Sequence, residues 1–140
     1  MKKAITAEII TSLLVLLFVY AGFSKLADLT ASGRAMHNQP FPGWLADILV
    51  WAVPAAELLV AAGLLFTRTR RSAVYAFLVL MGIFTVYIAA ILLRLFPRVP
   101  CSCGGVIRSL GWGQHLAFNL FFTGLAAALL VLDKRERRLP

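Results

Sequence analysis

The strongest constraint on the fold of this chain is a series of apolar segments, each long enough to cross a lipid bilayer. Four such segments are predicted, at residues 7–26, 45–66, 72–95 and 114–132. A helix needs about 20 apolar residues to span the hydrocarbon core of a membrane. Only 14% of the 140 residues are charged, whereas a soluble domain usually contains about 25%. We therefore predict an all-α polytopic membrane protein, in which residues 1–140 form a single four-helix transmembrane domain.

The basic residues are distributed unequally between the two ends of the predicted bundle. The formal net charge is +8, but the basic side chains lie at membrane boundaries, so we do not interpret the charge as nucleic-acid binding. The termini and the second connection together carry nine of them: Lys2, Lys3, Arg68, Arg70, Arg71, Lys134, Arg135, Arg137 and Arg138. The other two connections carry five: Lys25, Arg34, Arg94, Arg98 and Arg108. Because cytoplasmic loops are enriched in Lys and Arg, we expect both termini in the cytoplasm of an inner-membrane protein.

This orientation places the only two cysteines, Cys101 and Cys103, on the outer face of the membrane. In a Gram-negative bacterium that face is the periplasm, where disulfides form and persist. No carboxylate lies near the pair, whereas Arg98 and Arg108 do. Nearby cations favour the thiolate form of a cysteine, which is the nucleophile in disulfide exchange. A strained disulfide between closely spaced cysteines is labile, which suits an exchange catalyst. We therefore take Cys101 and Cys103 as candidate catalytic residues.

Two other interpretations of the cysteine pair remain open. The pair can form a structural clip across a tight loop in a non-catalytic assembly factor. It can also bind a soft metal, because thiolates prefer Cu(I) or Zn(II), but two sulfur ligands are too few without a further ligand such as His115. Our prediction includes neither a metal site nor a cofactor.

His115 and Asn119 are four residues apart near the start of the fourth segment. This spacing places both on one face of a helix, from which both can point into the bundle beneath the cysteine loop. The unperturbed pKa of histidine is near 6.5, so His115 is a candidate for proton transfer during thiol chemistry. The alternatives are that His115 and Gln114 cap the helix at the headgroup level, and that Asn119 joins helices by hydrogen bonds.

Glu57 lies well inside the second apolar segment. A carboxylate in the membrane is costly, so we expect it to face the bundle interior and to be hydrogen-bonded there. Lys25 is a possible partner, but it lies near the outer end of the first segment, whereas Glu57 lies about 18 Å below the start of the second at 1.5 Å per residue. This difference in depth argues against a direct ion pair. Other available partners are Tyr20, Ser24, Thr85, Tyr87 and Asn119.

Several motifs in this chain resemble those of DoxX-like membrane proteins and, more narrowly, of the methylamine utilisation protein MauE family. The resemblance covers nearly the whole chain. It rests on the four-helix layout, on YAGFSKL at residues 20–26 and on PAAEL at residues 54–58. It also rests on the stretch from PCSCGG at residues 100–105 to QHLAFN at residues 114–119, which is similar to that of redox-associated members.

The resemblance implies a membrane bundle that helps a periplasmic thioredoxin-like or cysteine-containing partner to handle disulfides. In the namesake pathway it implies maturation of the disulfide-rich small subunit of methylamine dehydrogenase. We therefore predict a thiol–disulfide relay or maturation factor in which Cys101 and Cys103 exchange disulfides. Competing functions are the assembly factor with a structural clip and a protein that handles a metal or small molecule through Glu57, Asn119 and the thiols. The sequence leaves the oligomeric state open.

Overall fold

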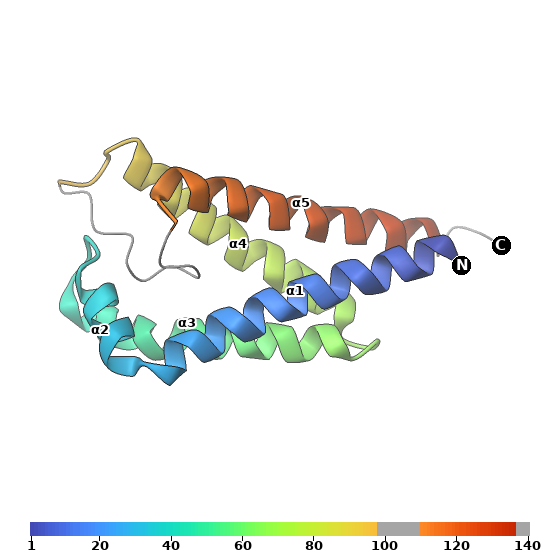
Figure 1. Cartoon of the computed structure of the whole chain (residues 1–140), viewed down its shortest axis with the longest axis horizontal. Helices are drawn as coiled ribbons and strands as arrows, with labels where there is room; N and C mark the ends of the chain where they lie inside the picture. The colour runs from blue at the N-terminus through green and yellow to red at the C-terminus, as the bar shows by residue number, and fades with distance from the viewer. Residues whose placement is uncertain (98–109, 137–140) are drawn as a thin grey trace.

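All of the regular secondary structure in the described part of this chain is helical. The computed structural model describes residues 1–97 and 110–136. They form α1 (Lys2–Ala27), α2 (Leu29–His37), α3 (Gly43–Leu65), α4 (Arg70–Leu92) and α5 (Trp112–Glu136) (Figure 1). Four of these helices, all except α2, are long and apolar enough to cross a membrane. The predicted all-α fold with four membrane-spanning helices is therefore confirmed.

The short helix α2 lies between the first two apolar segments, where the sequence analysis predicted no helix. Asp28 begins this helix as its N-cap, and its carboxylate accepts a hydrogen bond from the backbone N–H of Ala31 at 2.9 Å. Such a cap satisfies one of the amide donors that a helix start leaves without a partner. The helix packs against the beginning of α3 and the end of α1, so this connection forms part of the bundle.

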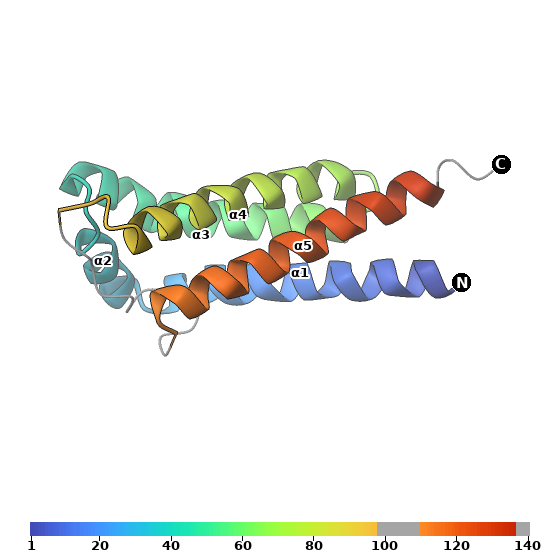
Figure 2. The ribbon, with the colours of Figure 1, turned by 90° about the horizontal axis from the view of Figure 1, so that it is seen from above.

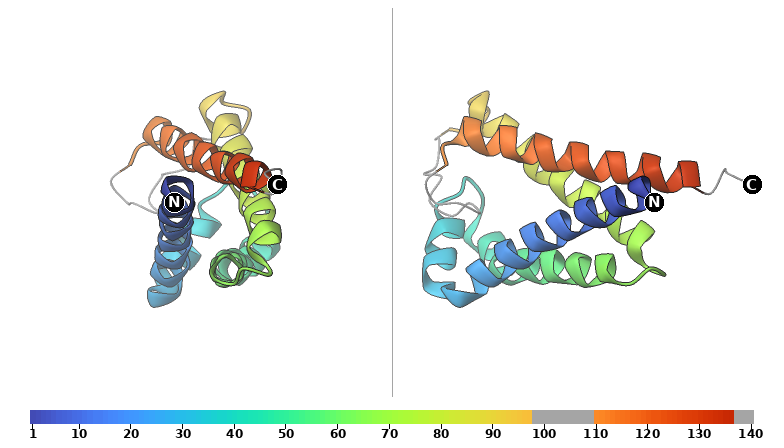
Figure 3. Two further views of the ribbon diagram at one scale, coloured as in Figure 1. Left: turned by 90° about the vertical axis from the view of Figure 1, so that its right-hand side faces the viewer. Right: turned by 45° about the vertical axis from the view of Figure 1, so that its right-hand side comes forward.

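The four long helices run in alternating directions along one common axis. The start of α1 and the end of α5 lie at one end of the bundle and α2 lies at the other (Figure 1). Helix α1 packs mainly against α3, and α4 packs mainly against α5. Helices α3 and α4 overlap in the view from above in Figure 2, but Figure 1 shows that they diverge from their connecting turn toward the α2 end. Figure 3 gives an end-on and an oblique view of the same arrangement.

The core is built from apolar side chains of all four long helices, and its largest members come from α1 and α4. The rings of Phe18 and Phe77 stack with centroids 4.3 Å apart, and both residues are fully buried. Many other apolar side chains point outward, including Leu16, Leu59 and Val79, each more than 60% exposed. An outward apolar surface is what a bundle needs in a bilayer, where the surrounding lipid is as apolar as leucine.

At the end that holds the termini, polar contacts close the turn between α3 and α4. The hydroxyl of Thr69 donates to the carbonyl of Gly63 at 2.7 Å, and the guanidinium of Arg70 donates to that of Leu64 at 3.2 Å. Arg70 also contacts the carboxylate of Glu8 on α1 at 2.6 Å. These contacts place the basic turn beside the start of α1, in agreement with the grouping of basic residues derived from the sequence.

At the opposite end, α4 stops at Leu92, three residues before the predicted limit of its apolar segment. Arg94 has a φ of 54°, in the left-handed region. The N–H of Arg94 donates to the carbonyl of Ile91, and that of Leu95 donates to the carbonyl of Ala90, both at 3.0 Å. This pair of bonds is the Schellman motif that ends many helices.

Close approach of α1 to α3 depends on Gly22. A Cβ atom at this position would lie 2.7 Å from Cγ of Leu58 and 3.3 Å from the carbonyl oxygen of Pro54. Neither neighbouring atom is the free end of a flexible side chain, so a methyl group at residue 22 would push the two helices apart. Small residues at helix interfaces have this role in many membrane bundles.

We predict that Gly22→Ala lowers the free energy of unfolding by about 1–3 kcal/mol, the usual cost of overpacking. The matched control is Gly82→Ala on α4, where an added Cβ meets nothing within 4 Å and where alanine favours the helix. Unfolding by SDS in mixed micelles, followed by far-UV circular dichroism, measures both variants. Equal stability of the two variants would contradict the close packing at Gly22.

Candidate functional site

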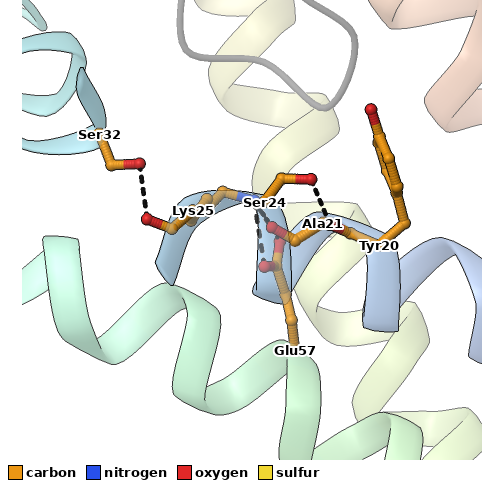
Figure 4. Close-up of polar contacts among 6 residues, drawn as sticks. All are labelled: Tyr20, Ala21, Ser24, Lys25, Ser32 and Glu57. Carbon is orange, nitrogen blue, oxygen red and sulfur yellow. Dashed lines mark hydrogen bonds and ion pairs between the residues drawn. The ribbon is translucent and has the colours of Figure 1, made fainter. Parts of the chain in front are cut away.

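A buried ion pair joins α1 to α3 near the α2 end of the bundle (Figure 4). The ammonium of Lys25 lies 3.0 Å from both carboxylate oxygens of Glu57. The Glu57 side chain is 3% exposed and that of Lys25 is 17% exposed. The prediction that Glu57 faces the bundle interior therefore agrees with the structure. Charged groups inside membrane proteins commonly pair in this way, because an unpaired charge there is costly.

The neighbouring backbone and α2 complete the surroundings of this pair. The third donor of the Lys25 ammonium reaches the carbonyl of Ala21 at 3.2 Å, so all three N–H groups of the ammonium have acceptors. The carbonyl of Lys25 accepts a hydrogen bond from the hydroxyl of Ser32 on α2 at 2.9 Å (Figure 4). Ser32 thereby satisfies one of the last carbonyls of α1, which have no partner within the helix.

The expectation that depth prevents a direct Lys25–Glu57 contact was wrong. It assumed that the outer ends of the first two membrane helices lie at one level. In the structure, Gly22 of α1 already lies beside Pro54 and Leu58 of α3, so α3 extends well beyond the end of α1. The short helix α2 packs against α1 and α3 at this end. Lys25 is therefore level with the middle of α3.

The other partners considered for Glu57 are engaged elsewhere or make no bond with it. The hydroxyl of Ser24 donates to the backbone carbonyl of Tyr20, one turn earlier on α1 (Figure 4). The Tyr87 hydroxyl donates to the side-chain amide oxygen of Gln39 at 2.6 Å. Within residues 1–97 and 110–136, the side-chain donors of Thr85 and Asn119 are buried and have no hydrogen-bond partner.

The polar residues at the start of α5 have different roles in the structure. The side chain of Gln114 accepts a hydrogen bond from the N–H of Gly111 at 3.0 Å and so caps the helix, in the manner of the third residue of a capping box. His115 and Asn119 instead contribute to the wall of a partly open cavity between the helices. Asn119 is only 4% exposed.

The cavity has a volume of about 300 Å³ and lies between the helices near their α2 end. Every helix contributes to its wall, which is mostly apolar. The Lys25–Glu57 pair, His115 and Asn119 all border it. Its other polar or aromatic lining residues are Phe18, Ser32, Gln39, Phe41, Phe84, Tyr87, Trp112 and Phe118. The structure thus brings together four of the eight site residues predicted from sequence.

The remaining four predicted site residues, Cys101, Cys103, Arg98 and Arg108, lie outside the described residues. Their connection starts after Pro97 and ends before Leu110. Within the described ranges, no three His, Asp, Glu or Cys side chains are grouped so that they could hold a metal ion.

Sequence reasoning missed the contribution of α2 and the residues just after it. Ser32, Ala35, Met36 and Gln39 all line the cavity. Counted from Ser32, the others follow after three, four and seven residues, which is the spacing of a single helical face. The sequence therefore did contain a pattern that indicates this helix. It was hidden by Gly33 and by the prolines that follow, which favoured an interpretation as a loop.

Comparison with known proteins identifies the family of this chain. The sequence model described as "Methylamine utilisation protein MauE" matches residues 3–132. The chain belongs to the MauE family. It is 30% identical over 119 residues to the methylamine utilization protein MauE of Paracoccus denitrificans, a match that covers 83% of this chain. It is 32% identical over 125 residues to MauE of Paracoccus versutus, covering 85% of this chain.

The matched regions cover 63% of the length of the P. denitrificans MauE protein and 67% of that of P. versutus. The chain thus spans about two thirds of these relatives. No solved structure matches the chain.

We predict that removing one partner of the buried ion pair destabilises the fold more than removing both. Lys25→Met leaves the Glu57 carboxylate without its partner and should lower the free energy of unfolding by about 3 kcal/mol. The double variant Lys25→Met/Glu57→Leu should recover most of this loss, because it leaves no charge unpaired. SDS unfolding in mixed micelles measures each variant.

Glu8→Gln is the matched control, since Glu8 pairs with Arg70 and its side chain is 63% exposed. Exposed pairs contribute at most about 1 kcal/mol. If the double variant loses the sum of the two single losses, Lys25 and Glu57 do not interact energetically.

Proposed function

We propose that this chain is an inner-membrane maturation factor of the methylamine-utilisation type, which exchanges disulfides with a periplasmic thioredoxin-like or cysteine-containing protein. The observation that carries this proposal is the match to the MauE family over residues 3–132, which includes Cys101 and Cys103. The named relatives are methylamine utilization proteins. The corresponding partner in that pathway is the disulfide-rich small subunit of methylamine dehydrogenase, or a thioredoxin-like protein that acts on it.

The proposed chemistry is a two-step exchange. A thiolate of the pair attacks one sulfur of a partner disulfide, which forms a mixed disulfide and releases the other partner sulfur as a thiolate. The second cysteine of the pair then attacks the mixed disulfide. This step forms the Cys101–Cys103 disulfide and releases the partner as a dithiol, so the partner is reduced and the pair is oxidised. The reverse sequence oxidises the partner.

The proposed roles of the flanking residues follow from their charge and position. Arg98 and Arg108 favour the thiolate form of the pair through their positive charge. His115, at the start of α5, accepts the proton that the attacking thiol loses and returns it to the leaving thiolate. Its position supports this role, because His115 is only five residues beyond Leu110, where the described chain resumes after the cysteine connection.

The uneven distribution of basic residues between the two ends of the bundle supports a periplasmic location for the cysteine connection. Phe96, which follows α4, contacts Tyr87, and Tyr87 contacts Phe41 after α2; the ring centroids are 5.9 and 6.1 Å apart. The chain therefore leaves α4 at the α2 end, opposite the basic turn and the two termini (Figure 1). Under the positive-inside rule, the α2 end faces the periplasm.

A trapping experiment tests the exchange. In the single variants Cys101→Ser and Cys103→Ser, one thiol remains to form the mixed disulfide but none remains to resolve it. We expect one variant to accumulate a larger, reductant-sensitive species on non-reducing gels, in which the partner can be identified. Ser102→Ala, which keeps both thiols, is the matched control and should accumulate none. A wild-type pair that is fully oxidised and inert to mild reductant, with no adduct in either variant, would indicate a structural clip.

A labelling experiment tests the orientation. A membrane-impermeant maleimide applied to spheroplasts should label the reduced Cys101–Cys103 pair. It should label a cysteine introduced as Thr67→Cys in a Cys101→Ser/Cys103→Ser background only after the membrane is permeabilised. The reverse pattern would place the termini outside and exclude a periplasmic relay.

A further inference from the structure

The cavity between the helices has the composition of a small-molecule site. Its volume of about 300 Å³ is at the lower end of the range for ligand pockets, which are mostly apolar with a few placed polar groups. Aromatic side chains from different helices form much of its wall, among them Phe18, Phe84 and Phe118. Such walls favour a flat ring system, because aromatic pairs gain energy from stacked and edge-to-face contacts.

The charged groups at the wall favour a neutral occupant. The Lys25 ammonium already donates to both oxygens of Glu57 and to the carbonyl of Ala21. It therefore has no further N–H group for an anionic ligand. The Glu57 carboxylate is engaged by the same ammonium, so the pair adds no net charge to the cavity wall.

One polar group at the wall has no partner in the described protein. The side-chain amide nitrogen of Asn119 is buried and makes no hydrogen bond within residues 1–97 and 110–136, and Asn119 is 4% exposed. A buried donor without an acceptor is unfavourable, and nearly all such groups in proteins are paired. Asn119 lines the cavity, but its amide nitrogen is covered by neighbouring atoms, so its side chain must rotate for this donor to reach an acceptor atom on an occupant.

We propose that this cavity binds a neutral, bilayer-soluble ring ketone whose carbonyl oxygen accepts a hydrogen bond from the side-chain amide of Asn119. The aromatic side chains contact the ring system, and the Lys25–Glu57 pair borders the cavity without contributing net charge. This site goes beyond the disulfide exchange proposed above, since it involves neither cysteine.

Two probes of matched shape test the proposal: 9-fluorenone, a planar three-ring ketone, and fluorene, which has the same skeleton without the carbonyl. The full chain is reconstituted in lipid nanodiscs with Trp44→Phe and Trp51→Phe. These two tryptophans are more than half exposed, and their replacement leaves Trp112, at the cavity wall, as the only tryptophan. Quenching of Trp112 fluorescence reports fluorenone binding, and fluorene is added as a competitor.

We expect saturable quenching by fluorenone and displacement by fluorene only at about two- to tenfold higher concentration, the contribution of one neutral hydrogen bond. In Asn119→Leu this preference should vanish while both probes still bind. Ala35→Phe, which fills the cavity from the partly exposed helix α2, should abolish the saturable component for both probes. If Asn119→Leu loses its helical circular dichroism signal, Asn119→Ala replaces it with the same expected result.

Quenching that rises linearly with fluorenone and is unchanged by Ala35→Phe would show partitioning into lipid only and would overturn the proposal. So would a preference for the ketone that persists in the Asn119 variant. Because none of these variants changes Cys101 or Cys103, failure of this proposal is distinguishable from failure of the disulfide exchange.

Discussion

The ion pair between Lys25 and Glu57 is the interaction on which the arrangement of this bundle depends. Its two residues come from α1 and α3, and all three donors of the ammonium have acceptors. In a bilayer, an unpaired charge inside the bundle is costly, so each of the two residues constrains the position of the other. The pair therefore fixes how far α1 slides along α3. Gly22, one turn before Lys25, lets the two helices approach closely enough for the contact.

The position of the pair also divides the bundle into two functional halves. Toward the termini, the interior is filled by apolar packing of residues such as Leu14, Leu64 and Phe77. Toward α2, the ion pair, His115 and Asn119 surround a cavity. The described residues that flank the cysteine connection in the sequence lie at this same end of the bundle. Chemistry by the thiols and binding in the cavity would thus take place at one end of the molecule, while the other end anchors it.

The sequence predicted the features that depend on composition and on position within a single helix. The four membrane-spanning helices follow from the length of the apolar runs, and the inward position of Glu57 follows from the cost of an exposed carboxylate in lipid. The spacing of His115 and Asn119 placed them on one face of α5, and both do line the cavity. None of these inferences needs knowledge of how one helix lies against another.

What the sequence could not supply is the relative level of the helices. The Lys25–Glu57 contact requires α3 to extend beyond α1, and α2 packs against both helices at that end. The spacing of Ser32 and Gln39 indicates a helix, but Gly33 and the nearby prolines favour a loop, so the helix was not predicted. The exchange chemistry at Cys101 and Cys103 remains a prediction, because both residues lie outside the described ranges.

The measurement that tests this account most directly is a solid-state NMR distance between the Lys25 side-chain nitrogen and the Glu57 carboxyl carbon. The chain would be labelled with ¹⁵N at lysine Nζ and ¹³C at glutamate Cδ, in lipid bilayers, with Lys25→Met as the control. We expect strong dipolar dephasing that disappears in the control, since Nζ lies 3.0 Å from both carboxylate oxygens. Dephasing that is absent, or equal in the two samples, would show that α1 and α3 are not joined at this point.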